Sequence, residues 1–235
     1  MKFSLIVPMY NEAAIIEDSA RTFHDYLAAH FDSSELLFVD DGSADDCAAR
    51  VEALELPDTR VLRYTPNQGK GNAVKTGMLA ASGEVRMFLD ADVAYGTEVI
   101  GRAAKLLDEQ PDKAMVIGSR PLHPEGYAGY TPLRKLASKT YIKVLNVAGG
   151  FRLSDSQCGC KAYRGEAAEA IFSRTETKGF AFDFETILWA QKLGYGVAEM
   201  PVCIVNHRAS KVHVLRDTFK MLKELRAIKK RVRKG

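Results

Sequence analysis

The chain has 235 residues, of which 46% are hydrophobic and 27% are charged, and its formal net charge at pH 7 is +3. This length allows one large domain with a sizeable core, and the composition excludes low-complexity, collagen-like and disordered proteins. The apolar runs are too short for a membrane-spanning helix or a signal peptide, so we expect neither. Four scattered cysteines (Cys47, Cys158, Cys160 and Cys203) indicate reduced thiols in the cytoplasm rather than a disulfide framework.

The first 120 residues alternate between short apolar runs and segments with helical spacing. Strands are predicted at residues 2–8, 36–39, 60–64, 85–89 and 114–118, and helices at 11–31, 44–54, 70–81 and 98–109. Asn11 is the expected N-cap of the first helix. This alternation predicts an α/β fold with a mostly parallel, Rossmann-like sheet flanked by helices.

The regular alternation of predicted strands and helices ends after Arg120. Residues 123–130 are rich in Gly, Pro and Tyr and predict a loop, and residues 133–147 predict a helix that ends at Gly149 and Gly150. A strand near 155–163, a helix over 184–193 and a strand over 196–202 follow. We interpret this half as an elaboration of one domain rather than a separate domain.

Polar residues follow the predicted strands at the point where each strand ends. They occupy residues 8–12, 40–41, 90–92 and 119–120. Ligands of parallel α/β sheets bind at the carboxyl ends of the strands. A purely structural sheet would not need carboxylates at successive strand ends, so the sequence predicts an active site at this edge.

Asp90 and Asp92 are the candidate metal ligands. Two carboxylates one residue apart, just after a buried strand, can enter one cleft, and Mg²⁺ or Mn²⁺ prefers such oxygen ligands. A bound ion would neutralise a diphosphate leaving group. The alternative is a helix cap beside a solvated Asp. Asp40 and Asp41 could accept hydrogen bonds from a base and a ribose, or form an Asx-turn.

The order of the motifs V-P-x-Y-N-E, V-D-D-G-S, N-x-G-K-G-x-A, G-E-x-x-x-x-L-D-A-D and G-S-R resembles glycosyltransferase family 2 over residues 3–120. The segments 155–161, 182–185 and 210–211 are similar to those of polyprenyl-phosphate hexosyltransferases, most closely the dolichyl-phosphate glucosyltransferases. The dolichyl-phosphate mannose synthases are more distant, and the Gln that they add as a metal ligand is replaced here by Ala94. The resemblance implies the GT-A fold and an inverting, metal-dependent transferase.

The resemblance also implies roles for individual residues. Nucleotide contacts are expected from Pro8, Tyr10, Glu12, Val39, Asp41, Lys70 and Ala91, and metal contacts from Asp90 and Asp92. The acceptor phosphate is expected to meet Arg120, Arg134, Ser138, Arg208 and Lys211, and the sugar and acceptor pocket to contain Asp155, Gln157, Asp183 and Glu185. Asp90, Asp92, Arg120 and Arg134 are the expected catalytic residues.

The residues themselves support part of this assignment. Arg134 and Ser138 are four residues apart on a predicted helix and share a face, and a guanidinium with a hydroxyl suits a phosphate. Each basic residue alone could equally be a solvated helix charge. The resemblance places Asp183 and Glu185 where a base would deprotonate a hydroxyl acceptor. Because a phosphate acceptor is already ionised and needs no base, these acids could instead hold sugar hydroxyls or a basic side chain, and Asp183 could be a helix cap.

The last 25 residues carry a charge pattern of their own. Residues 211–235 contain ten Lys or Arg and two acidic residues, a local charge of +8, whereas the first 210 residues carry −5. Leu215, Phe219, Leu222, Leu225, Ile228 and Val232 recur every three or four positions. This pattern predicts a basic amphipathic helix that lies in a membrane interface, or one that docks on its own domain. Aromatic residues do not interleave with the charges, which argues against nucleic acid.

The sequence thus predicts a GT-A domain at 1–211, with a nucleotide-sugar half at 1–120 and an acceptor half at 121–211, and a membrane-interface helix at 212–235. We expect hexose transfer from a UDP-hexose, preferably UDP-glucose and less readily a GDP-hexose, to a polyprenyl or dolichyl phosphate. The expected location is the cytoplasm, peripherally on the inner face of the cell membrane. The alternatives are transfer to a saccharide or protein hydroxyl, and a non-catalytic protein that binds nucleotides or membranes.

Overall fold

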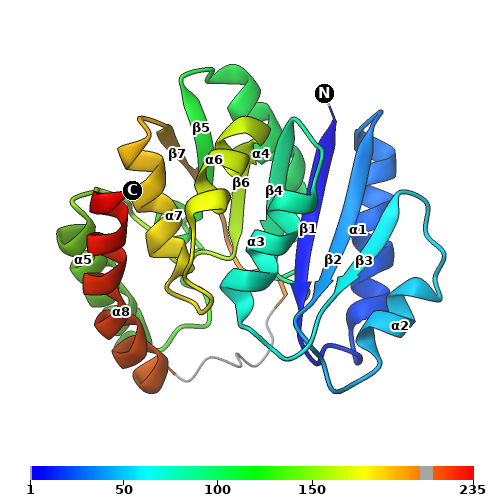
Figure 1. Ribbon diagram of the computed structural model, residues 1–235, viewed down its shortest axis with the longest axis horizontal. Coiled ribbons are helices and arrows are strands. Elements are labelled where there is room, and N and C mark those ends of the chain that lie inside the picture. Colours follow the sequence, from blue (N-terminus) through cyan, green and yellow to red (C-terminus); the bar gives the residue numbers. More distant parts are fainter. Residues whose placement is uncertain (1, 207–213) are drawn as a thin grey trace.

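A seven-stranded sheet forms the centre of the molecule in the computed structural model, which describes residues 2–206 and 214–235, without the side chains of Arg134 and residues 214–223. The strands are β1 (Phe3–Met9), β2 (Ser34–Asp40), β3 (Thr59–Arg63), β4 (Val85–Leu89), β5 (Lys113–Ser119), β6 (Cys160–Arg164) and β7 (Gly196–Pro201). Their order in the sheet is β3-β2-β1-β4-β6-β5-β7 (Figure 1).

All strands run parallel except β6, which pairs antiparallel with both β4 and β5. The carboxyl ends of β1, β2, β4 and β5 therefore meet at one edge, the lower edge in Figure 1. The polar clusters of the sequence follow these four strands. The structure confirms the predicted mostly parallel α/β sheet in a single domain.

Helices cover both faces of the sheet. They are α1 (Ile16–His30), α2 (Cys47–Glu52), α3 (Lys70–Ala80), α4 (Glu98–Glu109), the 3₁₀ helix η1 (Arg120–Leu122), α5 (Pro132–Gly149), α6 (Gly165–Arg174), α7 (Phe182–Lys192) and α8 (Val214–Lys234). Figure 1 shows α3, α6 and α7 in front of the sheet and α1 and α4 behind it. Strand residues such as Leu5, Phe38 and Phe88 are completely buried between these layers, which stabilises the fold by the hydrophobic effect.

The start of α1 differs from the prediction. The helix begins at Ile16, and Asn11 has a left-handed φ of 53° instead of capping it. The Asn11 backbone N–H donates to the Ser43 hydroxyl (2.9 Å), and its side-chain oxygen accepts from the Ala44 N–H (2.8 Å). Asn11 is therefore used to join two loops at the carboxyl edge. The helix α6, which the sequence pattern did not predict, covers the sheet after β6.

The described part of α8 packs on its own domain. Leu225, Ile228 and Val232 are buried, and α8 contacts α7. The Lys192 ammonium of α7 donates to the Val232 carbonyl at the end of α8 (2.6 Å). For residues 224–234 the structure therefore favours the second alternative, a helix docked on its own domain, because the described large apolar residues are covered by protein. Within the described ranges, no helix is long and apolar enough to cross a bilayer.

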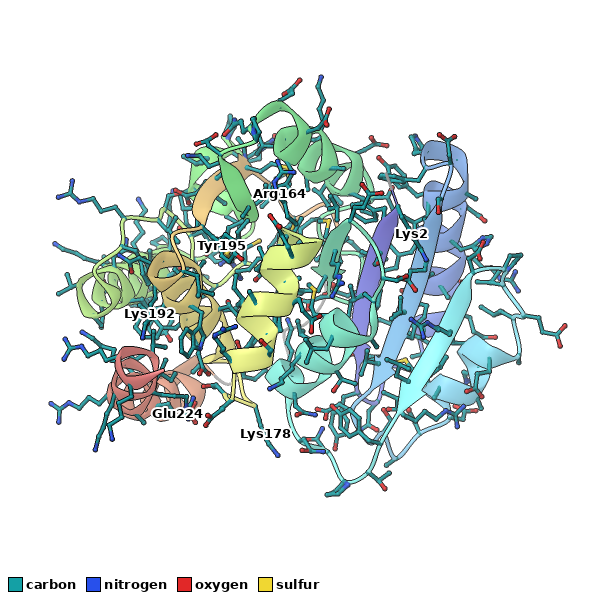
Figure 2. All side chains as sticks on the ribbon, turned by 45° about the horizontal axis from the view of Figure 1, so that its top comes forward. Lys2, Arg164, Lys178, Lys192, Tyr195 and Glu224 are labelled. Atoms are coloured by element: carbon teal, nitrogen blue, oxygen red, sulfur yellow. The ribbon has the colours of Figure 1, made fainter. Side chains whose placement is uncertain are left out.

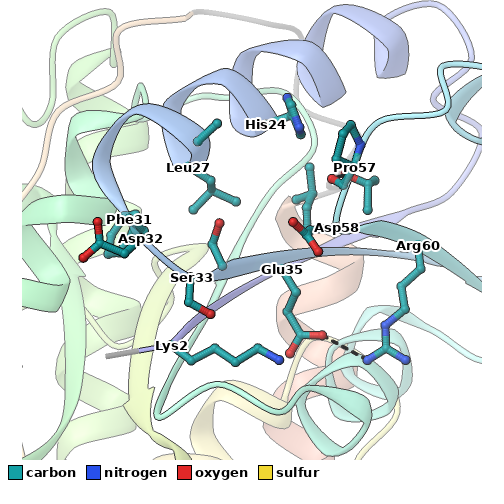
Figure 3. A pocket seen from close by; sticks show the side chains of 14 residues that line it. Lys2, His24, Leu27, Phe31, Asp32, Ser33, Glu35, Pro57, Asp58 and Arg60 are labelled. Atoms are coloured by element: carbon teal, nitrogen blue, oxygen red, sulfur yellow. Dashed lines mark hydrogen bonds and ion pairs between the residues drawn. The ribbon is translucent and has the colours of Figure 1, made fainter.

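A polar cluster fixes the opposite, amino-terminal edge of the sheet. The Glu35 carboxylate accepts hydrogen bonds from the Ser4 hydroxyl (2.6 Å) and the Ser82 N–H (2.6 Å) and pairs with Arg60 (3.1 Å; Figure 3). Burial opposes ionisation of Glu35, but the bonds from Ser4 and Ser82 outweigh it and lower its pKa to about 2. The groove beside this cluster has a volume of about 660 Å³.

Candidate active site

A tight turn after β4 holds the two candidate metal ligands. The Val93 N–H donates to the Asp90 carbonyl (3.3 Å), and Val93 itself has a left-handed φ of 51°. The Asp92 carboxylate accepts from the Ala94 N–H (3.1 Å), and the Ala91 carbonyl accepts from the Ser19 hydroxyl of α1 (2.5 Å). A β-branched residue at positive φ is strained, and such strain gathers at functional sites.

Lys70, at the start of α3, forms an ion pair with Asp90. Burial disfavours the charged ammonium, but Asp90 and Asp183 outweigh burial and raise the pKa of Lys70. Burial and the charge of Asp90 raise the pKa of Asp92, and Glu12 adds to this effect. The site thus combines one ammonium with an excess of carboxylate charge.

The backbone of Gly159 approaches the Asp90 carboxylate so closely that a Cβ at this position would overlap its oxygens. The absence of a side chain at Gly159 therefore sets where the Asp90 carboxylate lies. This explains why the segment 155–161, distant in sequence from Asp90, carries a glycine there.

The donor set at this turn fits a hard divalent cation. Asp90 and Asp92 offer oxygen ligands, and Glu12 lies close enough to influence Asp92 electrostatically. Among the described residues, no group of three or more His, Cys, Asp or Glu side chains could hold a metal ion by itself. Mg²⁺ and Mn²⁺ suit sites with few carboxylates, because water and substrate phosphates complete their coordination.

Asp41 organises the loop that leads into α3. Its buried carboxylate accepts hydrogen bonds from the Tyr64 hydroxyl (2.7 Å), the Asn67 amide (2.9 Å), and the backbone N–H groups of Gln68 (2.8 Å) and Gly69 (2.9 Å). These bonds position the residues just before Lys70. The structure therefore gives Asp41 a role in shaping the site in addition to the expected nucleotide contact.

Arg120 and Asp155 form a second ion pair on the acceptor side. The guanidinium binds both carboxylate oxygens of the fully buried Asp155 (2.6 and 3.1 Å) and donates to the Tyr130 hydroxyl (3.0 Å). Burial acts to lower the pKa of Arg120, but the charge and hydrogen bonds of Asp155 outweigh burial, so the net effect is a raised pKa. These bonds use three of the five guanidinium N–H donors. Glu199 of β7 binds the Asp155 N–H (3.2 Å) and so holds this segment in place.

Asp183 is paired with a buried lysine. The Lys161 ammonium lies 2.6 Å from the Asp183 carboxylate and also donates to the Cys158 carbonyl (2.7 Å). Lys161 is completely buried and Asp183 nearly so. Burial raises the pKa of Asp183, and Lys161 opposes this shift. The pair joins β6 to α7 beside the site, since Asp183 also influences Lys70.

Glu185 faces the C-terminal helix. Its completely buried carboxylate pairs with Arg231 of α8 (2.9 Å) and accepts the backbone N–H groups of Thr177 (2.8 Å) and Glu176 (3.3 Å). The structure thus gives the Glu185 carboxylate a basic partner, and its expected place in the sugar and acceptor pocket stays a prediction. Of the alternatives weighed for these acids, it takes the partnership with a basic side chain.

The remaining predicted residues divide into three groups. Tyr10 is exposed, and Pro8, Glu12, Gln157 and Ser138 are half-buried, with Ser138 near the Tyr127 hydroxyl. Val39 and Ala91 are buried, and Val39 belongs to the core of β2, so their expected nucleotide contacts stay predictions. Arg208 and Lys211 lie outside the described residues, as does the side chain of Arg134.

Sequence reasoning missed several residues that build the site. Lys161 could have been found, because a lysine inside an otherwise apolar strand segment demands a buried partner. Tyr130, Glu199 and Arg231 gave no such signal. Asn206 gave no signal in the sequence either. Its side-chain amide donates to the Asp92 carbonyl (2.8 Å) and so ties the segment after β7 to the turn that holds the candidate metal ligands.

Known proteins share sequence similarity with this chain. Glycosyl transferase family 2 matches residues 4–172. A dolichyl-phosphate beta-glucosyltransferase of Trichomonas vaginalis is 34% identical over 211 residues, covering 85% of this chain and 62% of the relative. One of Dictyostelium discoideum is 29% identical over 238 residues, covering 94% and 72%. The chain thus spans under two thirds of the length of the Trichomonas relative.

The fold also resembles solved structures. Glucosyl-3-phosphoglycerate synthase from Mycobacterium tuberculosis, crystallised with Mn²⁺, UDP and phosphoglyceric acid, superposes with a TM-score of 0.72 at 20% identity, covering 98% of this chain and 78% of that one. This likeness supports the GT-A fold. Because the family match runs from β1 into α6 and includes the turn with Asp90 and Asp92, the chain belongs to glycosyl transferase family 2.

Proposed function

We propose that this chain is an inverting, metal-dependent glycosyltransferase that moves glucose from UDP-glucose to a polyprenyl phosphate. The names of its relatives support the glucosyl group and the lipid phosphate. The UDP and Mn²⁺ crystallised with the Mycobacterium enzyme support a UDP-sugar donor and a divalent cation. The single observation that carries the choice of acceptor is the ion pair between Asp183 and Lys161.

The donor half of the site binds the diphosphate. Asp90 and Asp92 would hold Mg²⁺ or Mn²⁺, which when bound would neutralise charge on the departing diphosphate. Lys70 adds an ammonium beside them and is itself oriented by Asp90. At an effective dielectric constant near 20, two opposite unit charges ~4 Å apart attract by roughly 4 kcal/mol, enough to favour the leaving group.

The acceptor half presents a cation instead of a base. Asp183 and Glu185, the acids at the positions considered for a base, are engaged with Lys161 and Arg231. An acceptor hydroxyl needs a base to take its proton, whereas an ionised phosphate does not. Arg120 uses three of its five N–H donors on described residues, and the other two would be directed at such a phosphate.

The reaction is then a single displacement. An acceptor phosphate oxygen forms a bond to the anomeric carbon while the bond from that carbon to the diphosphate oxygen breaks, and the electron pair leaves with UDP. Attack from the face opposite the leaving group inverts the configuration. The residues of the chain contribute mainly positioning and electrostatic stabilisation.

An acceptor panel tests this proposal. The purified chain is supplied with UDP-glucose and Mn²⁺ together with a short-chain polyprenyl phosphate, the matching polyprenol or a free saccharide, and released UDP is measured. Of the three acceptors, we expect only the polyprenyl phosphate to cause release of UDP. Equal or faster release with polyprenol or saccharide would show a hydroxyl acceptor, and UDP binding without turnover of any acceptor would show a binding protein.

The variant Asp183→Asn tests the absence of a base at this position. Loss of a general base typically lowers the rate by about 10²- to 10⁴-fold. We expect a smaller loss here, below about tenfold, once thermal unfolding has shown that the variant is folded. The double variant K161M/D183N removes both charges of the buried pair and keeps the test valid if Asp183→Asn alone does not fold.

A further inference from the structure

The helix α5 exposes an apolar stripe to solvent. Leu133, Leu136, Val144 and Val147 are 77%, 63%, 42% and 78% exposed. They recur at helical spacing, so they lie along one side of α5. Soluble proteins rarely leave a contiguous set of large apolar side chains uncovered without a binding role.

The other sides of α5 are accounted for. Ile142 and Leu145 are buried, and α5 contacts α7. Lys135, Lys139 and Lys143 are exposed and four residues apart, so they form a row between the buried side and the apolar stripe. The helix therefore has one side for its own domain and, turned away from it, an apolar stripe beside a row of ammonium groups.

We propose that this apolar stripe and lysine row of α5 dock on the surface of an anionic lipid bilayer. An amphipathic helix with lysines beside its apolar side binds such an interface by combined burial and charge attraction. A second copy of the chain fits less well, because pairing two α5 helices through this side would bring two lysine rows together. Acidic lipid headgroups complement them.

The position of α5 connects this surface to the acceptor side of the site. Tyr130, two residues before α5, binds the Arg120 guanidinium (3.0 Å), and the Lys135 ammonium lies 5.3 Å from the centre of the Tyr127 ring. The exposed Leu133 and Leu136 thus lie in the part of α5 nearest Arg120 along the chain. A lipid whose phosphate reaches Arg120 would start from the bilayer that these leucines enter.

The described side chains of α8, from residue 224 on, contribute charge to this end of the molecule. Figures 1 and 2 both show α8 next to α5, and Figure 2 labels Lys192 and Glu224 there. The apolar residues of the described part of α8 are buried on the domain, whereas Arg226, Lys230 and Arg233 are exposed. Among the described side chains of these two helices, the exposed large apolar ones therefore belong to α5, and α8 adds positive charge on the same end.

Vesicle co-sedimentation of the 235-residue chain tests the proposal without donor or acceptor. Phosphatidylcholine vesicles with and without phosphatidylglycerol are compared, and binding is expected only to the anionic vesicles. The variant L136S/V147S should bind these vesicles about tenfold or more weakly, because two large apolar side chains no longer enter the interface. Circular dichroism checks that each variant is folded.

The charge variants separate specific docking from general attraction. Lys139→Glu should weaken binding to anionic vesicles roughly fivefold or more. The matched control Lys105→Glu changes the net charge equally on α4, where the Lys105 side chain is 73% exposed, and should bind like the wild type. Equal losses in the two variants, or wild-type binding by L136S/V147S, would overturn the proposal.

The remaining outcomes are also decisive. If the chain is dimeric by size-exclusion chromatography and L136S makes it monomeric without changing vesicle binding, the stripe is a contact between copies. The proposed function supplies a reason for docking, namely access to a lipid phosphate, but the docking itself is measured independently of transfer. Vesicle binding through α5 without any transfer to a lipid phosphate would reject the proposed acceptor and leave this surface standing.

Discussion

Individual residues at the carboxyl edge are oriented by ion pairs before any substrate binds. Asp90 is held by Lys70, Asp155 by Arg120 and Asp183 by Lys161. Groups that are fixed in advance do not need to reorganise during the reaction, which is where much of the stabilisation of a charged transition state comes from. Gly159, which touches Asp90, is the residue that tests this idea most directly.

Gly159→Ala should damage the donor site while leaving the fold nearly intact. The added Cβ would overlap the end of the Asp90 side chain, which can rotate away at little cost to stability but then leaves Lys70 and the metal position. We expect the dissociation constant of UDP in the presence of Mn²⁺ to rise roughly tenfold to a hundredfold, measured by calorimetric titration.

Gly179→Ala is the matched control, because nothing lies within 4 Å of a Cβ at that position. It should bind UDP like the wild type. A Gly159→Ala variant that also binds UDP normally would show that the placement of Asp90 does not matter for the donor.

Among the elements, α8 is joined to the domain by ion pairs of Arg231 as well as by its buried apolar side chains. Arg231 pairs with the buried Glu185 (2.9 Å) and with Glu176 (2.9 Å). The variant Arg231→Met leaves the Glu185 carboxylate buried without its cation. Loss of one partner of a buried pair costs about 3–5 kcal/mol, and because Arg231 is partly exposed we expect about 2 kcal/mol, measured by urea unfolding.

Two further variants check this assignment. Arg233→Met changes an exposed arginine two residues along α8 and should leave the unfolding free energy within about 0.5 kcal/mol of the wild type. Glu185→Gln combined with Arg231→Met should recover part of the loss, since the buried carboxylate that lost its cation is then a neutral amide. Equal effects at the two arginines would contradict the role of Arg231.

For the whole molecule, resistance to acid depends on the cluster around Glu35. Its bonds join β1, β2 and the turn before β4 at the amino-terminal edge of the sheet. The pKa of Glu35 is lowered from 4.5 to about 2, so the folded state binds the proton less readily than the unfolded chain. This contribution is present above pH 4.5 and is lost as the pH falls toward 2.

The contribution is about 3 kcal/mol, because each unit of the pKa shift from 4.5 to about 2 corresponds to about 1.4 kcal/mol. Glu35→Gln should therefore be markedly less stable than the wild type at neutral pH, and the difference should shrink as urea unfolding is repeated toward pH 2. Glu109→Gln, at an exposed position on α4, is the control and should differ little from the wild type at neutral pH. A constant difference for Glu35→Gln would contradict the lowered pKa.

Prediction from the sequence was most successful where local pattern decides the outcome. Nearly every strand and helix was found, because apolar runs and helical spacing reflect which side chains are buried. The start of α1 was wrong, since Asn11 is held by Ser43 and Ala44, which belong to a distant loop. No local pattern reports such a contact.

The sequence by itself determined the α/β fold, the family and the edge of the sheet at which the polar motifs meet, because motifs that follow buried parallel strands come together where those strands end. The tertiary structure alone decided which charges are neighbours. It paired Asp183 with Lys161 and Glu185 with Arg231, buried the described large apolar residues of α8, and left the apolar stripe of α5 uncovered. Ion pairs and exposed faces depend on distances between residues far apart in the chain, and spacing along one segment cannot encode these distances.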